Sequence, residues 1–372
     1  MKILYVHIVG VGMMGVEKKI QGQFEACKQA GIDMEFLVVF VNCSSSIQCE
    51  VRSIEIRESN PMLREAKIFS ALKSEINCDS WDAVILRKPH FSPFFLRCFS
   101  NKNFKLILEH HTLEVPELIR LKCYLTALSE TFFAILCFGQ VDGIIAMTDE
   151  IAAYERSRGF SKPQNIKVIS NGIEISKVAV TGQDLFDGKH LRLVFVAAKN
   201  HAWHGLDRLI NSLEAYSGDL QIELHLICPH SEISHIQVHH PYVRLVTHGA
   251  LFGEDFDSVI AKMHLGVASL ALDRKGMAEA CTLKVREYMA RGLPFIMGHN
   301  DPDLPRSCDF YLKLDAINGS FDFSLVEMFI GELDKGAISQ KMHDYAVSHL
   351  DWKAKLREYV SFAEGVVIGD KK

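Results

Sequence analysis

Short runs of apolar residues alternate along the chain with longer stretches in which apolar positions recur at helical spacing. The first run spans 2–9, and a loop with three glycines separates it from a helical pattern over 16–31 and a second apolar run over 34–41. Runs rich in β-branched residues and without polar alternation are typical of strands buried on both faces of a parallel sheet. The order strand, loop, helix, strand predicts a βαβ unit at the start of the chain.

The same pattern continues in two series, separated by a polar stretch at 176–190 that we interpret as a linker. In the first series it predicts strands at 51–56, 82–86, 104–108, 141–147 and 166–170, with helices at 61–76, 118–139 and 149–158. In the second it predicts strands at 191–196, 222–227, 243–246, 265–269, 295–297 and 310–312, with helices at 206–216, 283–291, 325–333, 338–350 and 351–366. Strands that alternate with helices in this way predict two doubly wound α/β domains with parallel sheets.

The composition is typical of a protein with two hydrophobic cores. The chain has 372 residues, of which 48% are apolar and 23% charged, and its formal net charge is −5. This acidic balance argues against a dedicated nucleic-acid-binding protein, which normally carries a basic excess. None of the ten cysteines forms a Cys-x-x-Cys motif, so zinc-ribbon and thioredoxin-like sites lack support, and the scattered thiols indicate a reducing compartment. The N-terminus lacks the layout of a signal peptide, and we expect a cytoplasmic protein.

The most apolar region, 118–138, has two interpretations. Arg120, Lys122 and Glu130 interrupt it, which makes it too polar for a transmembrane helix. It either packs in the core or lies against a membrane surface. Because the region has few basic residues, the core interpretation is favoured.

Six histidines between 225 and 248 form a candidate metal site. His235 and His239 have the spacing of metal ligands on a helix. The prolines at 229 and 241 indicate a loop instead, and no acid or cysteine completes a ligand set. No metal site is predicted from the sequence.

The most informative stretch is 279–294, in which Glu279 and Glu287 stand eight positions apart. Thr282 can cap a helix, good helix formers follow it, and Gly292 ends the pattern. Glu279 is therefore expected before the helix, and Glu287 about 7 Å along its axis. The unpaired N–H groups of a helix N-terminus favour anions, so a ligand with its diphosphate there would meet one glutamate at each end. A nucleotide-sugar has that length and polarity.

This segment resembles the donor-site signature of GT-B glycosyltransferases, especially the retaining family 4 enzymes of bacterial polysaccharide synthesis. Glu279, Glu287 and the tail 288–294 match the family pattern, and 280–284 is similar to its Ser-Pro-Leu-Lys form. The resemblance implies that Glu279 holds hydroxyls of the donor sugar and that Glu287 holds the ribose. It also implies that the residues at the helix start bind the substrate, with the last three at the departing diphosphate: Cys281, Thr282, Leu283 and Lys284.

Two other segments of the second half match the family in part. Lys199 and His204 take the positions of an arginine and a lysine that hold the donor diphosphate in the family. His204 is a departure, because a histidine is mostly neutral near pH 7 unless an adjacent diphosphate raises its pKa. Asn171-Gly172 is similar to the family's turn before the crossing between domains, which makes both residues substrate-binding candidates.

A predicted strand ends in Glu109, His110 and His111. Polar residues at the carboxyl end of a strand lie where open α/β sheets bind ligands. Family members often carry a histidine here that faces the donor sugar, and His111 matches that position better than His110. The resemblance makes His111 a catalytic candidate together with Glu279 and Lys199, and makes Glu109 and His110 candidates for substrate binding.

The loop Gly10-x-Gly12-x-x-Gly15 has two interpretations. It matches the dinucleotide-binding fingerprint, but the next strand ends in Asn42, without the acid that would hold a cofactor ribose. It also resembles the first loop of the family through Gly15 and Glu17, which makes Gly15 a substrate-binding candidate.

We therefore expect a GT-B fold with an acceptor-side domain over 1–175, a linker over 176–190, a nucleotide-sugar domain over 191–350, and a C-terminal helix over 351–372 that crosses back to the first domain. The resemblance implies transfer of a sugar, with retention of configuration, from a UDP- or GDP-sugar to a hydroxyl of a saccharide or lipid-linked acceptor in surface polysaccharide synthesis. Neither a metal nor another cofactor is expected, nor a nucleic-acid partner. Peripheral contact with the inner face of the cell membrane stays open. The alternatives are a nucleotide-sugar epimerase, an NAD-dependent enzyme that uses the Gly10–Gly15 loop, and a non-catalytic partner subunit.

Overall fold

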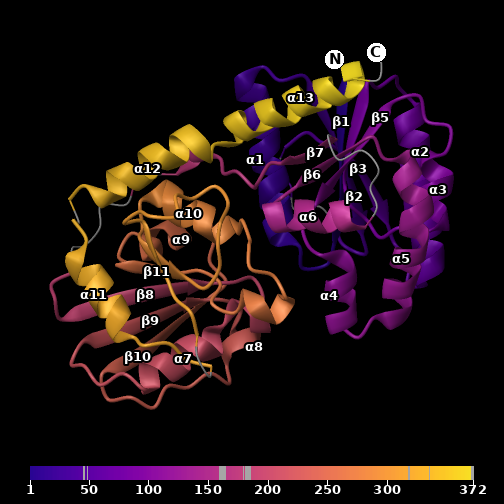
Figure 1. Ribbon diagram of the computed structural model, residues 1–372. Helices are drawn as coiled ribbons and strands as arrows, with labels where there is room; N and C mark the ends of the chain where they lie inside the picture. The colour runs from indigo at the N-terminus through magenta and orange to yellow at the C-terminus, as the bar shows by residue number, and fades with distance from the viewer. Residues whose placement is uncertain are drawn as a thin grey trace. The chain divides into compact units, whose positions relative to one another are not determined.

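The computed structural model describes residues 1–44, 47, 49–158, 165–178, 180, 186–316, 319–334 and 336–369, without the side chains of Met14 and Lys177. The chain divides into two compact units (Figure 1). The first unit comprises Met1–Ser170 and Trp352–Lys372, and the second comprises Asn171–Asp351. Part of the predicted linker, at 179 and 181–185, lies outside the described residues.

The first unit is built on a seven-stranded parallel sheet in the order β3-β2-β1-β4-β5-β6-β7. Its strands are β1 (Ile3–Gly10), β2 (Met34–Val41), β3 (Arg52–Ile56), β4 (Ala83–Arg87), β5 (Lys105–His110), β6 (Gly143–Ala146) and β7 (Ile166–Val168). Its helices are α1 (Met14–Ala30), α2 (Pro61–Asn77), α3 (Pro93–Phe99), α4 (Glu114–Arg120), α5 (Tyr124–Cys137), α6 (Asp149–Ser157) and α13 (Trp352–Gly369).

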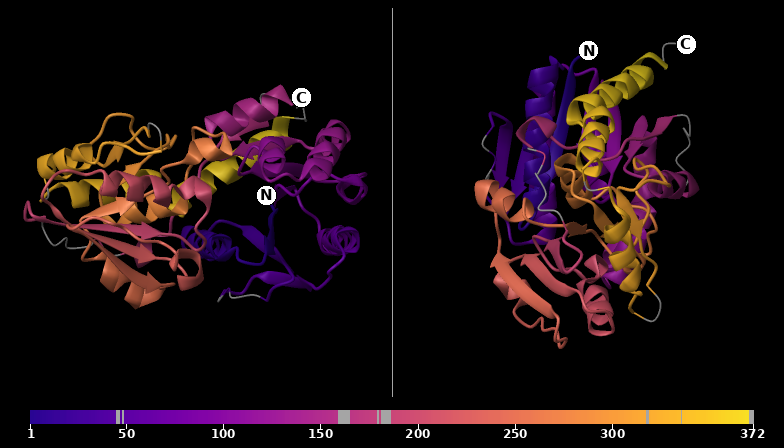
Figure 2. Two further views of the ribbon diagram at one scale, coloured as in Figure 1. Left: turned by 90° about the horizontal axis from the view of Figure 1, so that it is seen from below. Right: turned by 90° about the vertical axis from the view of Figure 1, so that its left-hand side faces the viewer.

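The second unit is built on a six-stranded parallel sheet in the order β10-β9-β8-β11-β12-β13, and Figure 2 shows helices on either side of it. Its strands are β8 (His190–Val196), β9 (Gln221–Ile227), β10 (Val243–Gly249), β11 (Leu265–Val267), β12 (Phe295–Met297) and β13 (Tyr311–Lys313). Its α-helices are α7 (Leu206–Glu214), α8 (His230–Ile233), α9 (Gly253–Ile260), α10 (Leu283–Arg291), α11 (Ser324–Glu332) and α12 (Ile338–His349). Short 3₁₀ turns are η3 (Ile175–Lys177), η4 (Ala202–His204) and η5 (Leu272–Lys275).

Each sheet reverses its strand order at one point. In the first sheet this point lies between β1 and β4, and in the second it lies between β8 and β11. Loops that leave a parallel sheet in opposite directions separate there, so open α/β sheets bind ligands at the carboxyl ends of these strands. In the second unit the loop after β8 carries Lys199 and His204, and the loop after β11 carries Glu279.

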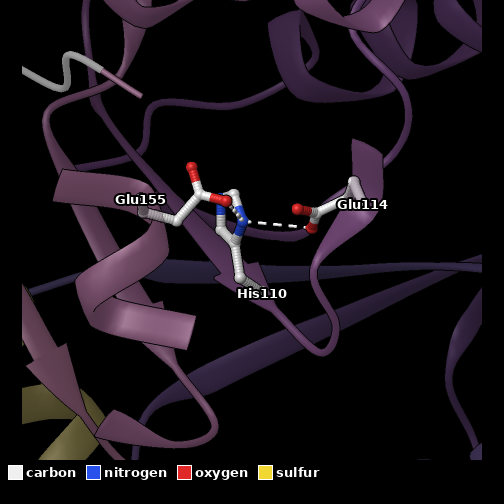
Figure 3. A group of neighbouring side chains, drawn as sticks. All are labelled: His110, Glu114 and Glu155. Carbon is white, nitrogen blue, oxygen red and sulfur yellow. Dashed lines mark ion pairs between the residues drawn. The ribbon is translucent and has the colours of Figure 1, made fainter. Parts of the chain in front are cut away.

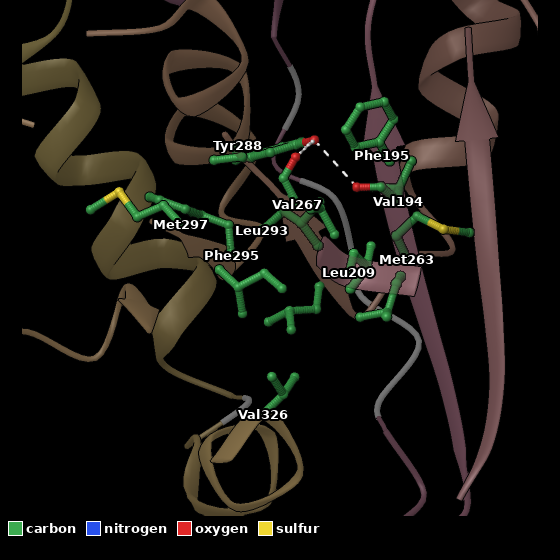
Figure 4. Packing of buried hydrophobic residues seen from close by; sticks show 14 of the residues in the cluster. Val194, Phe195, Leu209, Met263, Val267, Tyr288, Leu293, Phe295, Met297 and Val326 are labelled. Atoms are coloured by element: carbon green, nitrogen blue, oxygen red, sulfur yellow. Dashed lines mark hydrogen bonds between the residues drawn. The ribbon is translucent and has the colours of Figure 1, made fainter. Parts of the chain in front are cut away.

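The position of α10 on the second sheet is set by close packing. Tyr288 is buried in the core between β8 and β11, and its hydroxyl donates to the carbonyl oxygens of Val194 at 3.4 Å and Val267 at 3.3 Å (Figure 4). A side chain at Gly266 would lie 2.8 Å from the Tyr288 ring. Gly292 ends the helix with φ of 68°, as the sequence predicted. Contacts at the middle and the end of α10 therefore fix the position of the helix, and with it the position of its start.

The predicted helix over 118–139 differs from the structure in two respects. The structure divides the region into α4 and α5 around Lys122, whose φ is 59°. The outer face of α5 is exposed, so the favoured core interpretation holds only for the inner side of this helix. Glu130, the only charged residue within α5, is the one that is buried, because it pairs there with Lys88 and Arg158. Because these ion pairs hold Glu130 on the inner side of α5, the apolar side of the helix faces outward.

The last helix, α13, belongs to the first unit and buries an aromatic and aliphatic stripe there. The stripe consists of Trp352, Leu356, Tyr359, Ala363 and Val366. The Tyr359 hydroxyl donates to Glu109 Oε1 at 2.5 Å, and so links the C-terminal helix to the carboxyl end of β5.

We expect the substitution Tyr359→Phe to destabilise the protein by about 2 kcal/mol, because it removes a donor from a buried carboxylate without changing the packing volume. Chemical denaturation monitored by fluorescence measures the difference. Tyr124→Phe is the matched control, because Tyr124 is exposed. Equal stability of the two variants would contradict the assigned role of the Tyr359 hydroxyl.

Candidate functional site

The start of α10 has unpaired polar groups. Thr282 occupies the N-cap position with an extended backbone, and its side chain makes no capping hydrogen bond. Its hydroxyl oxygen is buried, and it has no hydrogen-bond partner in the described part of the chain. A helix of nine residues also directs its first N–H groups outward at a positive dipole end. This end of the helix can bind an anion through the backbone and the Thr282 hydroxyl.

A lysine in the first turn of α10 contacts the histidine that precedes α7. Lys284 Nζ lies 3.1 Å from His204 Nδ1 and 4.8 Å from the centre of the Phe195 ring. Burial lowers the pKa of Lys284 to about 7, and no carboxylate pairs with it among the residues that the structure describes. Burial, together with the Lys284 charge, lowers the pKa of His204 to about 2, so this imidazole is neutral. The Lys284 ammonium therefore lacks a counter-ion, which an anionic ligand would supply.

The loop after β8 brings a second cation to the same end of the sheet. The Lys199 side chain is exposed and has no carboxylate partner within the described ranges. The next residue, Asn200, donates its backbone N–H to Glu232 at 3.1 Å. Gly205 has φ of 74°, and a side chain there would lie 2.9 Å from Leu270, so the loop after β11 passes directly over the start of α7.

Two reciprocal ion pairs fix these loops to each other. Arg274 forms two hydrogen bonds with Asp207, at 2.8 and 2.7 Å, and Arg208 forms two with Asp273, both at 2.7 Å. Each arginine also donates to a backbone carbonyl, that of Ala202 or of Leu270. Planar two-point contacts of this kind restrict geometry more than a single contact does. They hold η5 against the start of α7.

Arg286 anchors the segment that leads into α10. Its guanidinium is fully buried, contacts Asp301 at 2.7 and 3.1 Å and Asp303 at 3.1 Å, and donates to the carbonyl oxygen of Asn171 at 2.6 Å. These carboxylates outweigh burial and raise the pKa of Arg286. The Asn171 amide in turn donates to the carbonyl oxygen of Cys281 at 2.9 Å. The predicted residues Asn171 and Cys281 are therefore bonded to each other, at the entrance to α10.

The two glutamates of the motif have different surroundings. Glu279 is half-buried and forms a parallel β-bridge with Asn300. Glu287 is 12% exposed and lies 3.3 Å from Arg291, which also pairs with Asp257 at 2.8 Å. Leu283 is half-buried in the first turn of α10, and Gly172 is buried in the turn after Asn171.

In the first unit, Glu109 is the centre of a buried hydrogen-bond network. Lys19 donates to Glu109 Oε1 at 2.8 Å, and His111 Nε2 lies 2.7 Å from Oε2. Burial alone would raise the pKa of Glu109, but Lys19 and His111 hold it well below its usual value. Burial lowers the pKa of His111 to about 4, so a neutral His111 donates from Nε2 and leaves Nδ1 as an acceptor. Glu109 thus orients the His111 ring, whose side chain is 21% exposed.

Because successive side chains of a strand alternate, His110 points to the other side of β5 from Glu109. It lies there in a separate buried cluster with Glu114 and Glu155 (Figure 3). Its Nδ1 lies 3.1 Å from both Glu114 Oε1 and Glu155 Oε1. Burial would lower the pKa of His110, but these two carboxylates raise it to about 9. Arg158 lies 3.3 Å from Glu155 and 3.6 Å from Glu114. The arrangement is that of an imidazolium whose Nδ1 faces two carboxylates, and Arg158 offsets part of the negative charge of these carboxylates.

The same three residues are close enough to be considered as metal ligands, since one ligand atom of each lies within 4.8 Å of the others. The charges of the wider cluster balance without an ion. Lys88, Arg158 and protonated His110 carry three positive charges, and Glu114, Glu130 and Glu155 carry three negative ones. A dication would have to displace the His110 proton and would lie beside Arg158. We therefore assign this cluster a structural role.

The glycine loop of the first unit leads directly into α1. Gly15 lies in the first turn of α1, which begins two residues before the predicted start, and is exposed. After β2 the chain continues with Asn42, whose side chain bonds to the backbone of Glu58. The position that holds an acid in the dinucleotide fingerprint therefore has an amide that is bonded to the loop after β3.

The candidates form two groups, one in each unit. In the second unit the structure brings together Lys284 with His204, and Asn171 with Cys281, around the start of α10. In the first unit it pairs Glu109 with His111 and directs His110 elsewhere. Sequence reasoning missed Arg286 with its aspartates, and Lys19 and Tyr359 beside Glu109. Nothing in the local spacing of these residues indicated that they meet, because their partners lie between 15 and 250 positions away in the chain.

No family model and no curated protein sequence matches this chain. Solved structures do match over nearly the whole length. One is the apo form of the lipopolysaccharide outer core galactosyltransferase WaaB, with a TM-score of 0.62 and 15% identity over 100% of both chains. Another is Anabaena Alr3699/HepE in complex with UDP and glucose, with a TM-score of 0.65 and 12% identity over 97% of this chain and 99% of that one. A third is an α-glucosyltransferase in complex with UDP-glucose and DNA containing an abasic site, with a TM-score of 0.64 and 14% identity over 98% and 99%.

These similarities show that the chain has the GT-B fold, which confirms the fold expected from the segment 279–294. Its structural neighbours are GT-B glycosyltransferases. Two of the three matched structures contain UDP or UDP-glucose.

We expect binding of inorganic pyrophosphate to weaken about tenfold per pH unit above pH 7, because the ligand requires the charged form of Lys284, whose pKa is about 7. Calorimetric titration between pH 6.5 and 9 measures this slope, and buffers of different ionisation enthalpy report the proton taken up. Lys284→Met should abolish the slope, whereas Lys262→Met, at an exposed lysine of the same unit, should keep it. A slope that survives Lys284→Met would exclude Lys284 as its source.

The His110 cluster predicts a pH dependence of stability with a defined sign. Because the folded pKa of about 9 exceeds the usual value of 6.5, the stabilisation is complete below pH 6.5 and is lost as the pH rises to 9. The free energy of opening of wild type relative to His110→Gln should therefore fall by about 3 kcal/mol over this range. Amide hydrogen exchange of β5 and β6 measures it within the first unit. A difference that is constant from pH 6 to 9 would mean that His110 is not protonated in the folded protein.

Proposed function

We propose that this protein is a glycosyltransferase that moves a sugar from a nucleotide-sugar to a hydroxyl group of an acceptor. The observation that carries the proposal is the Lys284–His204 contact at the uncapped start of α10, where the second sheet reverses its strand order. There a half-buried ammonium without a carboxylate partner in the described part of the chain, the N–H groups of a helix and the Thr282 hydroxyl are all suited to a diphosphate. The GT-B fold of the chain supports this proposal.

The proposed role of this group of residues is electrostatic. As the bond between the sugar and the diphosphate breaks, negative charge develops on the leaving oxygen, and donors that are already in place lower its free energy. Lys284 is held by burial and by His204, so little reorganisation is needed. We assign Lys199 to the outer phosphate, because its side chain is exposed at the end of β8. His204 acts through Lys284, as a neutral acceptor that holds the ammonium in place.

The remaining donor contacts follow the family resemblance. We propose that Glu279 accepts hydrogen bonds from the sugar hydroxyls and that Glu287 accepts them from the ribose. The half-buried position of Glu279 beside Asn300 supports its assignment, since a fixed backbone positions the carboxylate. Contacts from Cys281, Thr282 and Leu283 are proposed to come from the backbone and the Thr282 hydroxyl.

In the first unit we propose that His111 contacts the donor sugar near the reacting carbon. Its hydrogen bond to Glu109 supports this, because the bond fixes the ring and leaves Nδ1 as an acceptor. The burial of Glu109 and His110 favours positioning roles for both rather than direct contact with substrate. Gly15, at the start of α1, is a proposed site for backbone contact with a ligand.

The finer identity of the substrates is also a proposal. We propose a UDP- or GDP-sugar donor, retention of configuration, a saccharide or lipid-linked acceptor in surface polysaccharide synthesis, and no metal or other cofactor. The names of two structural neighbours, one with UDP and glucose and one from lipopolysaccharide synthesis, support the donor and the acceptor class. Another neighbour contains DNA, but the net charge of −5 disfavours a nucleic-acid acceptor here. All ten cysteines are free thiols, the form that a reducing, cytoplasmic location maintains.

We expect saturating UDP or GDP to raise the melting temperature, while ADP, CMP and NAD do not. A ligand at about 100 times its dissociation constant stabilises the native state by about 2.7 kcal/mol. Glu287→Ala and Lys199→Ala should reduce the shift and raise the apparent donor KM, whereas Lys262→Ala should leave both unchanged. A shift with NAD alone would replace the proposal by a dehydrogenase that uses the Gly10–Gly15 loop. Release of free sugar or of an altered nucleotide-sugar without acceptor would identify an epimerase, and no shift with any ligand would indicate a non-catalytic subunit.

A further inference from the structure

The hairpin formed by α4 and α5 has an apolar outer face. Eight large apolar side chains on this hairpin and its turn are exposed, with Leu125 at 85% and Ile135 at 76% of full exposure. The set, called the hairpin face below, consists of Ile119, Leu121, Tyr124, Leu125, Leu128, Phe132, Ile135 and Leu136. Contiguous apolar surface of this kind on a water-soluble domain marks a site of interaction.

The periodicity of α5 shows that the hairpin face is continuous. At 100° per residue, its six members within α5 fall in an arc of about 120°. The buried residues of α5 lie on the opposite side: Ala127, Glu130, Ala134 and Cys137. Small side chains on the inner side let α5 pack closely, while the large ones point to solvent.

The acidic and basic residues of the hairpin differ in exposure. Glu130 is fully buried and accepts hydrogen bonds from Lys88, Arg158 and the backbone of Phe91. Glu114 is buried as well, and Glu117 is half-buried. Arg120 and Lys122, in contrast, are exposed at the turn between the two helices. The exposed tip of the hairpin is therefore apolar and cationic, in a chain whose net charge is −5.

We propose that the hairpin face docks this protein on the surface of an anionic lipid bilayer. Leu, Ile, Phe and Tyr side chains would enter the boundary between headgroups and acyl chains, and Arg120 and Lys122 would contact anionic headgroups. A second copy of the same face is a poorer partner, because its exposed charges at the turn are the same two cations, Arg120 and Lys122. No described helix is long and apolar enough to cross a membrane.

The buried network of the first unit makes this surface a fixed feature of the fold. If α5 rotated to bury its apolar arc, Glu130 would lose Lys88 and Arg158, and an unpaired charge would remain in the interior. The docking does not depend on the proposed transferase activity and can be measured without a nucleotide-sugar. If both proposals hold, the first unit would lie where a lipid-linked acceptor is presented.

The test is co-sedimentation of the full chain with large unilamellar vesicles of phosphatidylcholine, alone or with about 30 mol% phosphatidylglycerol. Wild type should bind the anionic vesicles, and the binding should weaken with salt. The double variant Leu125→Ser/Phe132→Ser should reduce the partition coefficient at least about tenfold. Arg120→Gln/Lys122→Gln should reduce it about tenfold on anionic vesicles and leave neutral ones unaffected. The matched control is Leu325→Ser/Met328→Ser, at exposed apolar positions of α11, which should bind like wild type.

Two further measurements keep the result interpretable. All four positions of the hairpin variants are exposed, so the melting temperatures should equal that of wild type. Leu128→Trp should show a blue-shifted emission on anionic vesicles if that position enters the bilayer. Equal binding of wild type and Leu125→Ser/Phe132→Ser would overturn the proposal. So would a wild type that binds no vesicles but self-associates in light scattering through the same residues, which would make a second copy the partner.

Discussion

The buried contact between Arg286 and Asp301 is the interaction on which the site in the second unit depends. It joins the first turns of α10 to the loop after β12, and through Asn171 it also holds the turn that opens the unit. Because both groups are fully buried, removal of either partner would leave a charge in the interior at a cost of about 3–5 kcal/mol. The start of α10 therefore has one position, and Lys284, Thr282 and Cys281 are positioned with it.

A second feature of the site is that its hydrogen-bond donors lack acceptors of negative charge among the described residues. Ammonium groups that are withdrawn from water are normally paired with carboxylates, yet the half-buried Lys284 contacts a neutral imidazole and an aromatic ring, and desolvation lowers its pKa to about 7. Together with the Thr282 hydroxyl and the open helix end, this creates an excess of donors and positive potential in a small volume. Such an arrangement costs stability in the free protein, and the cost is offset when an anion binds. The structure thus favours a diphosphate-binding role at this point of the fold.

In the first unit, buried carboxylates determine which surfaces face outward. Glu109 accepts hydrogen bonds from Lys19, His111 and Tyr359, and so joins α1, β5 and the C-terminal helix. On the other side of β5, Glu130 pairs with Lys88 and Arg158, and Glu155 pairs with His110. The first network orients a histidine, and the second turns α5 so that its apolar side is exposed. Local pairing of charge in the interior thus explains both the candidate catalytic group and the hairpin face.

The sequence by itself determined the alternation of strands and helices, the two α/β series, and the helix after Thr282 with its end at Gly292, because these depend on periodicity and on residues close together in the chain. The resemblance of 279–294 to a donor-site signature also predicted the GT-B fold and supplied most of the candidate residues around α10. Only the tertiary structure decided that Lys284 meets His204 across 80 positions, that Tyr359 reaches Glu109 across 250, and that Arg286 is held by aspartates. It also decided that α5 exposes its apolar side, since periodicity reveals that a helix has two faces but not which of them is buried. That choice depends on where a distant lysine and arginine can neutralise Glu130, and a contact between residues far apart in the chain leaves no mark in local sequence.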